Sequence, residues 1–309
     1  MFEVSGCRIT PEQMKRWTDT FLPEQEPFYV NDEQLLNELK TLNVPVYSRS
    51  HFSAIASDFI GDYGGNYRHW NVPGSASIAF LKAIDLEEEV RSKLFSHQVA
   101  LGRGQVYTYK WVEDIDVDTF TILKESHDAG DGRIILTHDA WIRMPEKVKQ
   151  IWLLKWLRER VESTAMEVKF GAIPEHSKRV INRYVFTFPS KSGANCFSAA
   201  LGAYLGSNHL VENWLNTEPF FEFLKHEGLA KYEVITLTRN IGFRPHDVLV
   251  WENARGDAVH AAYAVSEKYC FNKMGQFWFQ PWQFVNIEHI LDYAGCLTNG
   301  GRICIYRSN

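Results

Sequence analysis

A cysteine at the start of an expected helix is the residue of this sequence best suited to nucleophilic chemistry. Cys196 lies in the segment 192–206, where a short loop leads into apolar residues at helical spacing and Gly206 ends the run. We therefore expect Cys196 in the first helical turn, where unpaired N–H groups and the helix dipole favour a thiolate. The same N–H groups are suited to hold a developing oxyanion.

A base and a residue to orient it follow further along the chain. His260 lies within a strand pattern at 257–265, and Asn272 follows in a second pattern at 269–274. If the two strands form a hairpin that turns near Ser266, His260 and Asn272 lie opposite each other on one face. Asn272 would then accept the imidazole N–H and fix its tautomer. A helix bearing Cys196, packed across that face, would complete a Cys-His-Asn site.

Each of these three residues also has an ordinary structural interpretation. A cysteine in a Gly/Ala-rich helix start is commonly a small core residue. A histidine in an apolar strand is commonly hydrogen-bonded within the core, and Asn272 before Lys-Met-Gly also suits a turn. Only the combination of all three favours the catalytic interpretation.

Together, these residues resemble the NlpC/P60 family, a papain-like family of cysteine peptidases and amidases. That family has a cysteine opening a helix, Pro-Gly-Asp before a strand, a histidine on the next strand and a polar residue about twelve positions later. The matching residues here are Cys196, the segment 245–247, His260 and Asn272. His246 replaces the glycine of Pro-Gly-Asp, and the family's Asp-Cys-Ser-Gly is Asn-Cys-Phe-Ser here. The resemblance runs from Cys196 to Leu291 and does not reach the first 185 residues.

The resemblance implies a papain-like domain in which a helix bearing the cysteine packs on an antiparallel sheet. It implies a cysteine hydrolase, a peptidase or amidase of the thiol protease type, that cleaves an amide bond in a small or cell-wall-type peptide. Cys196 would be the nucleophile, His260 the base and Asn272 its orienting partner, without a cofactor. The neighbours expected to bind substrate are Asn195, Phe197 and Ser198. The alternatives are a papain-like acyltransferase or transglutaminase-like enzyme, and a catalytically silent binding module.

Two other regions carry residues with chemical potential. The segment 127–133 together with His138 and Asp139 holds metal-binding residue types, but its spacing matches no ligand motif and DAGDG suits a loop, so we expect no metal site. Tyr67 and Trp70, in an aromatic and glycine-rich loop at 61–74, could form a wall for substrate. An ordinary packed loop is the more common explanation for such residues.

The composition excludes several classes of function. The chain has 309 residues with Lys+Arg 33 and Asp+Glu 38, a net charge of −5, so no basic excess is present to bind nucleic acid or an anionic membrane. The five cysteines are odd in number and contain no CxxC, which fits neither a disulfide framework nor a zinc knuckle. The start lacks a secretory signal pattern, and no apolar run reaches about 18 residues. These features predict a reduced, cytoplasmic protein, and the resemblance implies that its partner is a small peptide or peptide-like substrate.

The order of elements predicts an α+β protein with two domains. An N-terminal α+β accessory domain is expected at 1–185 and the NlpC/P60-like domain at 186–309. Helices are expected at 11–22, 32–42, 77–99 (a pair meeting near Leu86), 146–162 and 210–229. Strands are expected at 105–112, 118–123, 133–144, 166–170, 179–189, 232–238, 246–251, 257–265, 269–274 and 302–307.

Overall fold

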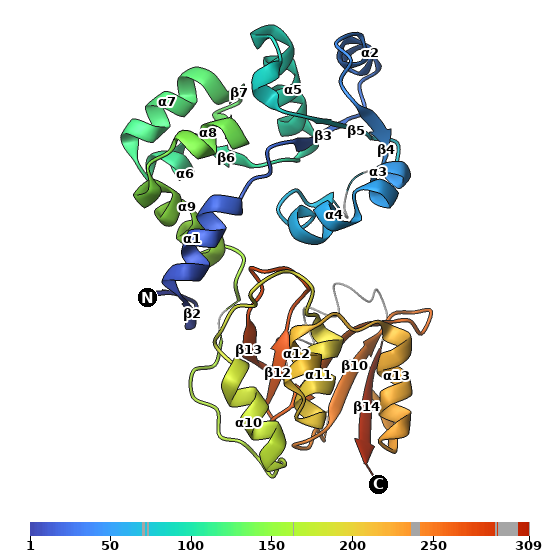
Figure 1. The fold of residues 1–309 in the computed structure, drawn as a ribbon. Coiled ribbons are helices and arrows are strands. Elements are labelled where there is room, and N and C mark those ends of the chain that lie inside the picture. The colour runs from blue at the N-terminus through green and yellow to red at the C-terminus, as the bar shows by residue number, and fades with distance from the viewer. Residues whose placement is uncertain are drawn as a thin grey trace. The chain divides into compact units, whose positions relative to one another are not determined.

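The computed structural model is an α+β protein with antiparallel sheets, and it describes residues 1–69, 72, 74–162, 164–235, 242–287, 289 and 302–308. The chain divides into two compact units, shown in Figure 1. One unit consists of Met1–Pro11 together with Leu157–Asn309, and we call it the sheet unit. The other, Glu12–Trp156, we call the helical unit.

The sheet unit is built on a six-stranded antiparallel sheet, with strand order β13-β12-β11-β10-β14-β9. Its strands are β9 (Leu229–Ile235), β10 (Val248–Glu252), β11 (Ala258–Ala264), β12 (Tyr269–Lys273), β13 (Trp282–Asn286) and β14 (Arg302–Ser308). Its helices are α10 (Glu175–Tyr184), α11 (Cys196–Leu205), α12 (Asn208–Glu212) and α13 (Thr217–His226). A hairpin of β1 (Phe2–Val4) and β2 (Cys7–Ile9) belongs to the same unit.

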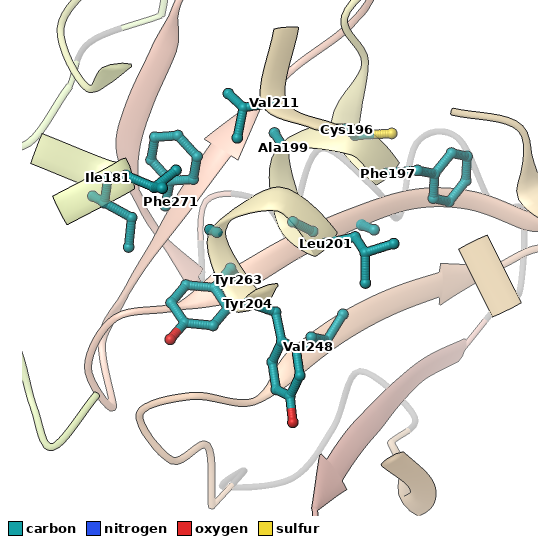
Figure 2. Packing of buried hydrophobic residues seen from close by; sticks show 14 of the residues in the cluster. Ile181, Cys196, Phe197, Ala199, Leu201, Tyr204, Val211, Val248, Tyr263 and Phe271 are labelled. Atoms are coloured by element: carbon teal, nitrogen blue, oxygen red, sulfur yellow. The ribbon is translucent and has the colours of Figure 1, made fainter. Parts of the chain in front are cut away.

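The two faces of the six-stranded sheet bury separate apolar clusters, because successive side chains of a strand point to opposite faces. The helix-side cluster joins Val250, Ala261, Tyr263 and Phe271 to side chains of α10 and α11 (Figure 2). The cluster on the opposite face contains Leu249, Trp251, Ala262, Cys270 and Val285. Helix α11 therefore packs against the face that carries Ala261 and Tyr263.

Helix α11 has well-defined ends and an unusually close neighbour. Asn195 accepts a hydrogen bond from the Ser198 N–H at 3.0 Å, and the Ser198 hydroxyl bonds in return to the Asn195 N–H, which makes a capping box. Gly206 ends the helix in the left-handed conformation with φ 67°. At Gly202, an added Cβ would lie 2.5 Å from Val211 of α12, so only glycine allows this approach.

The helical unit contains two small antiparallel sheets, ordered β3-β5-β4 and β6-β8-β7. The strands are β3 (Glu26–Val30), β4 (Val46–Ser48), β5 (Ser77–Leu81), β6 (Val106–Thr108), β7 (Asp128–Gly130) and β8 (Arg133–Ile135). The helices are α1 (Pro11–Thr20), α2 (Glu33–Thr41), α3 (Arg49–Ile55), α4 (Ser57–Tyr63), α5 (Glu88–Leu101), α6 (Tyr109–Glu113), α7 (Val117–His127), α8 (His138–Arg143) and α9 (Glu146–Arg158), with a short 3-10 helix at Ala83–Asp85. One apolar core joins β3 and β5 to α2 and α5.

Many of the expected elements are confirmed. Helices occupy most of 11–22, 32–42 and 146–162, and the segment 210–229 holds the end of α12 and then α13. The strands expected at 246–251, 257–265, 269–274 and 302–307 are β10, β11, β12 and β14. The strand expected at 232–238 is confirmed to Ile235 by β9, and its remainder lies outside the described residues.

Other expected elements are wrong. The strands expected at 118–123 and 179–189 are helices α7 and α10 over most of their length, and residues 166–170 form no strand. The segments 105–112 and 133–144 each begin as a strand and continue as a helix. The first half of the expected helix pair at 77–99 is β5, which pairs with both β3 and β4. The loop expected at 61–74 begins as the last turn of α4.

The division between the units also differs from the boundary expected at 185/186. The sheet unit begins at Leu157 rather than near residue 186, because Val180, Ile181 and Tyr184 of α10 are buried in the helix-side cluster. It also includes Met1–Pro11, far away in sequence.

Candidate functional site

Cys196 occupies the first position of α11, as the sequence predicts, and 7% of its surface is exposed. Burial raises the pKa of its thiol to about 11, although hydrogen bonds from the backbone N–H groups of Ala261, Phe197 and Cys196 act to lower it. Two of these donors, the N–H groups of Cys196 and Phe197, belong to the first turn of α11, where N–H groups have no acceptor within the helix. At neutral pH the group is therefore a thiol that faces three backbone donors.

The remaining donor, the Ala261 N–H, places the thiol at an opening between β11 and β12. These strands pair at Tyr263–Phe271 and Ala264–Cys270, and Ala261 lies beyond both pairs. The Ala264 N–H bonds to Asp247 on the β10 side, so the alternation of the ladder directs the Ala261 N–H toward β12. The Cys196 thiol occupies the place where a β12 carbonyl would otherwise accept that N–H.

His260 and Asn272 bridge the same two strands. His260 Nε2 lies 2.9 Å from Asn272 Oδ1, and both side chains are buried. The expectation that they share one face is confirmed by this contact. The expected register is wrong by two residues, because the observed pairs place Asn272 across from Ala262 rather than His260. The hydrogen bond therefore runs diagonally between the strands.

The proton positions on His260 follow from its partner. The Asn272 amide nitrogen lies 2.7 Å from Met274 Sδ, which directs the Asn272 oxygen toward His260. An amide oxygen only accepts, so His260 Nε2 carries the proton and Nδ1 has a free lone pair. Burial lowers the pKa of His260 to about 4, so the ring is neutral at pH 7. The Trp251 ring packs edge-on against it at 5.3 Å.

The expectation that α11 packs across the face of His260 is wrong. His260 pairs with Trp251, so it shares the face of the Trp251 cluster, whereas α11 covers the face of Ala261. Within the described part of the chain no hydrogen bond joins the Cys196 thiol to His260. The two residues approach the β11–β12 opening from opposite faces.

Lys273 is a residue of this region that the sequence analysis missed. It is fully buried on β12, pairs with Trp282 of the helix-side cluster, and donates from Nζ to the carbonyls of Gly275 at 2.5 Å and Phe277 at 3.2 Å. Burial lowers its pKa to about 7, and its charge acts to lower the pKa of Cys196. The sequence signal for Lys273 was a charged residue at a position where the alternation of the strand predicts a buried side chain.

The residues beside Cys196 that were expected to bind substrate have structural partners instead. The Asn195 side chain caps α11 and donates to the Leu215 carbonyl at 2.8 Å. Ser198 is fully buried in the capping box. Phe197 packs on the Phe220 ring with centroids 5.0 Å apart. These three side chains hold the start of α11 in place.

The aromatic wall expected from Tyr67 and Trp70 is not formed by Tyr67. Tyr67 belongs to the helical unit, is 2% exposed and donates its hydroxyl proton to Glu26 at 2.9 Å. It is therefore a core residue of that unit. Trp70 lies outside the described residues.

Neither a metal centre nor a membrane span is found among the residues described. No group of three or more His, Cys, Asp or Glu side chains there is arranged to hold a metal ion. His127 and Asp139 do meet, but in a hydrogen-bonded network with Thr137. No described helix has the length and apolar character needed to cross a membrane.

Comparison of the chain with protein-family models, curated proteins and solved structures found no match.

Proposed function

We propose that the sheet unit is a papain-like cysteine hydrolase that cleaves an amide bond in a small peptide or peptide-like substrate. The observation that carries the proposal is the arrangement around the β11–β12 opening. The Cys196 thiol meets N–H donors there, and the His260–Asn272 hydrogen bond spans the same strands. A nucleophile, a base and its orienting group are thus supplied by three adjoining elements.

The proton positions assign each role. Asn272 holds the proton of His260 on Nε2, so Nδ1 is the base that takes the thiol proton. Cys196 Sγ then attacks the carbonyl carbon, and the amine leaves with the proton from Nδ1. Water hydrolyses the thioester to a carboxylic acid and restores the thiol. The Cys196 and Phe197 N–H groups stabilise the oxyanion. Rotation of the thiol toward Nδ1 is required before the first step.

The backbone before β10 adds support for the family resemblance. His246, which stands where the NlpC/P60 family has glycine, adopts φ 80°, a conformation that favours glycine. Asp247 follows it in the Pro-Gly-Asp position and is 1% exposed. It binds Arg307 of β14 through two hydrogen bonds of 2.6 and 2.7 Å. A glycine at this position would adopt that φ without strain, which supports the resemblance.

The pH profile of Cys196 alkylation by iodoacetamide tests the proposal. If His260 is the base, the rate should be nearly constant from about pH 5 to 9 and fall as the ring is protonated near pH 4. In His260→Ala, the rate should instead rise about tenfold per pH unit, because only the thiolate fraction reacts below a thiol pKa of about 11. Mass spectrometry would assign the label to Cys196.

Two controls separate chemistry from folding. His260→Gln keeps a polar side chain in the core and should give the same steep profile as His260→Ala. Cys270, fully buried in the opposite cluster, serves as an internal thiol that should stay unlabelled while the protein is folded. A steep profile in the unmodified chain, unchanged by either His260 substitution, would reject the hydrolase.

A catalytically silent binding module is the second candidate, because the thiol and imidazole are both neutral and no hydrogen bond joins them within the described residues. That steep, His260-independent profile is its expected result. An acyltransferase shares the thioester step and differs in its acceptor. Peptide amides incubated with a primary amine distinguish the two enzymes, since transfer yields a new amide and hydrolysis a carboxylic acid.

A further inference from the structure

A pocket with a volume of about 270 Å³ lies in the helical unit, between α7, α8 and the residues that follow α8. Apolar side chains such as Ile122, Leu123 and Met144 line it, and its polar residues include Ser126, His127 and Arg143. Ser126 is exposed, whereas 4% of His127 is accessible. An exposed hydroxyl thus meets a buried imidazole beside an apolar space.

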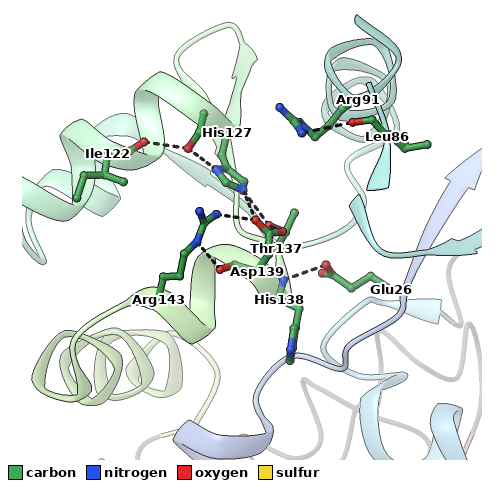
Figure 3. A network of polar contacts seen from close by, with 10 residues as sticks. Glu26, Leu86, Arg91, Ile122, His127, Thr137, His138, Asp139 and Arg143 are labelled. Atoms are coloured by element: carbon green, nitrogen blue, oxygen red, sulfur yellow. Dashed lines mark hydrogen bonds and ion pairs between the residues drawn. The ribbon is translucent and has the colours of Figure 1, made fainter. Parts of the chain in front are cut away.

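Polar side chains next to the pocket form a hydrogen-bonded network (Figure 3). The geometry of this network determines which of its groups carry the protons. Hydrogen bonds from His127 and Thr137, together with the charge of a protonated His127 and that of Arg143, hold the pKa of Asp139 at about 2 against the effect of burial. Asp139 is therefore a carboxylate and only accepts. The Thr137 hydroxyl donates its single proton to Asp139 Oδ1 at 2.6 Å.

This leaves one tautomer for His127. Its Nε2 lies 2.9 Å from Thr137 Oγ1 and 3.6 Å from Asp139 Oδ2. Since the Thr137 proton is used, Nε2 must carry the hydrogen and donate it. In the neutral ring His127 Nδ1 then has a free lone pair, and it lies 2.7 Å from Ser126 Oγ, closer than the competing Ile122 carbonyl at 3.0 Å.

We propose that Ser126, His127 and Asp139 form a second hydrolytic site, specific for esters with a short apolar acyl group. Ser126 is the nucleophile and His127 Nδ1 the base. Asp139 orients the ring through the Thr137 hydroxyl, which accepts from Nε2 and donates to Asp139, and the Asp139 carboxylate lies 3.6 Å from Nε2. In a serine protease Nε2 is the base and Nδ1 faces the aspartate, whereas here Nδ1 is the base and Nε2 faces the aspartate. The pocket volume of about 270 Å³ is just below the range typical of drug-sized ligands, so the pocket accommodates only a short acyl group.

The reaction needs no further reagent than water. Ser126 Oγ attacks the ester carbonyl while its proton moves to His127 Nδ1. The alcohol then leaves with that proton, forming an acyl-serine. Water hydrolyses the acyl-serine to a carboxylic acid and restores the hydroxyl. Arg143 gives two of its five N–H groups to Asp139, and because Arg143 also lines the pocket we assign its remaining N–H groups as the oxyanion donors.

A short-chain alkyl fluorophosphonate, added to the full chain, tests the site directly. Mass spectrometry should locate the label on Ser126, and hydrolysis of p-nitrophenyl butyrate should fall at least about 100-fold in Ser126→Ala. Cys196→Ser should keep both the label and the hydrolysis. A failure of the thiol site is thereby distinguished from a failure of this one.

Thr121→Ala is the matched control, because Thr121 also lies exposed on α7 with its hydroxyl oxygen 3.0 Å from the carbonyl oxygen four residues earlier, as the Ser126 hydroxyl oxygen is from that of Ile122. It should leave labelling and ester hydrolysis unchanged. Ser126 is exposed, so its substitution by alanine should leave the fold intact, which circular dichroism checks. An unlabelled Ser126, or equal ester hydrolysis by the Ser126→Ala and Thr121→Ala variants, overturns the proposal.

Discussion

Glu26 is a carboxyl group in the core of the helical unit, with 2% of its surface exposed. Its oxygens accept hydrogen bonds from the Tyr67 hydroxyl and the His138 N–H, both at 2.9 Å. Burial raises the pKa of Glu26 from 4.5 to about 8, so the folded state retains a proton that the unfolded state releases. The stability this gives is complete below about pH 4.5 and is lost as the pH rises toward 8.

Glu26→Gln should remove this pH dependence, because a neutral amide replaces the neutral acid. We expect the variant to exceed the original chain in free energy of unfolding by several kcal/mol at pH 8, from about 1.36 kcal/mol per pKa unit. Urea denaturation at pH 5, 6.5 and 8 measures the difference. Glu24→Gln is the control, since Glu24 is exposed and paired with Lys82. Equal pH responses of the two variants would contradict the assignment.

At the same scale, sequence reasoning identified the contact between His260 and Asn272 but not the side from which Cys196 approaches. Strand alternation alone places two residues of equal parity on one face, and they bond at 2.9 Å. The packing face of α11 depends on which side of the sheet carries small residues. The small residue Ala261 could have indicated that α11 packs on its face of the sheet rather than on the face of His260. Ser126 of the second site was missed because the contact between its neighbour His127 and Asp139 is formed only in the folded chain.

At the scale of elements, His246 combines a strained backbone with strong ring contacts. Its φ is 80°, yet its ring stacks on Tyr204 with centroids 4.4 Å apart and its Nδ1 lies 2.8 Å from the Tyr263 hydroxyl. His246→Ala should lose the contacts and keep the strain, whereas His246→Gly relieves the strain. We expect the glycine variant to be more stable than the alanine variant by about 1–2 kcal/mol.

Urea denaturation midpoints of the two variants measure this difference. The same pair at Glu227, where φ is −76°, should show the opposite order, because glycine then only adds unfolded-state entropy. An alanine variant at His246 at least as stable as the glycine variant would show that the turn relaxes.

The helices with long apolar stripes and most strands of the six-stranded sheet were predicted well, whereas segments whose pattern fits both the helical and the strand period were not. The six residues at 118–123 alternate as a strand would, but Asp116 caps a helix there by accepting from the Thr119 N–H. In α10, the buried residues Ser177, Val180, Ile181 and Tyr184 follow helical spacing. A window of a few residues does not separate the two periods, so tertiary burial decides between them.

At the scale of the whole molecule, the sheet unit is discontinuous in sequence. Val4, Cys7 and Ile9 of the β1–β2 hairpin are buried within it. The Arg8 N–H donates to the Phe186 carbonyl at 2.8 Å, and the Ser5 hydroxyl donates to the Val161 carbonyl at 3.1 Å. A boundary drawn from local composition assigns these residues to the first domain, because nothing local to them records a contact more than 150 residues away.

Removal of residues 1–10 should therefore destabilise the sheet unit and spare the helical unit, to which most of the nearby sequence belongs. Burial of a side chain such as Val4 or Ile9 contributes roughly 1.5–3 kcal/mol, so we expect a loss of several kcal/mol. Hydrogen exchange should show faster exchange in β10–β12 and unchanged protection in β3 and β5. Glu3→Ala is the control, because its exposed side chain leaves the hairpin in place. Equal loss of protection in both units would show that they unfold together, so that the hairpin's contacts would support the whole chain rather than the unit that buries them.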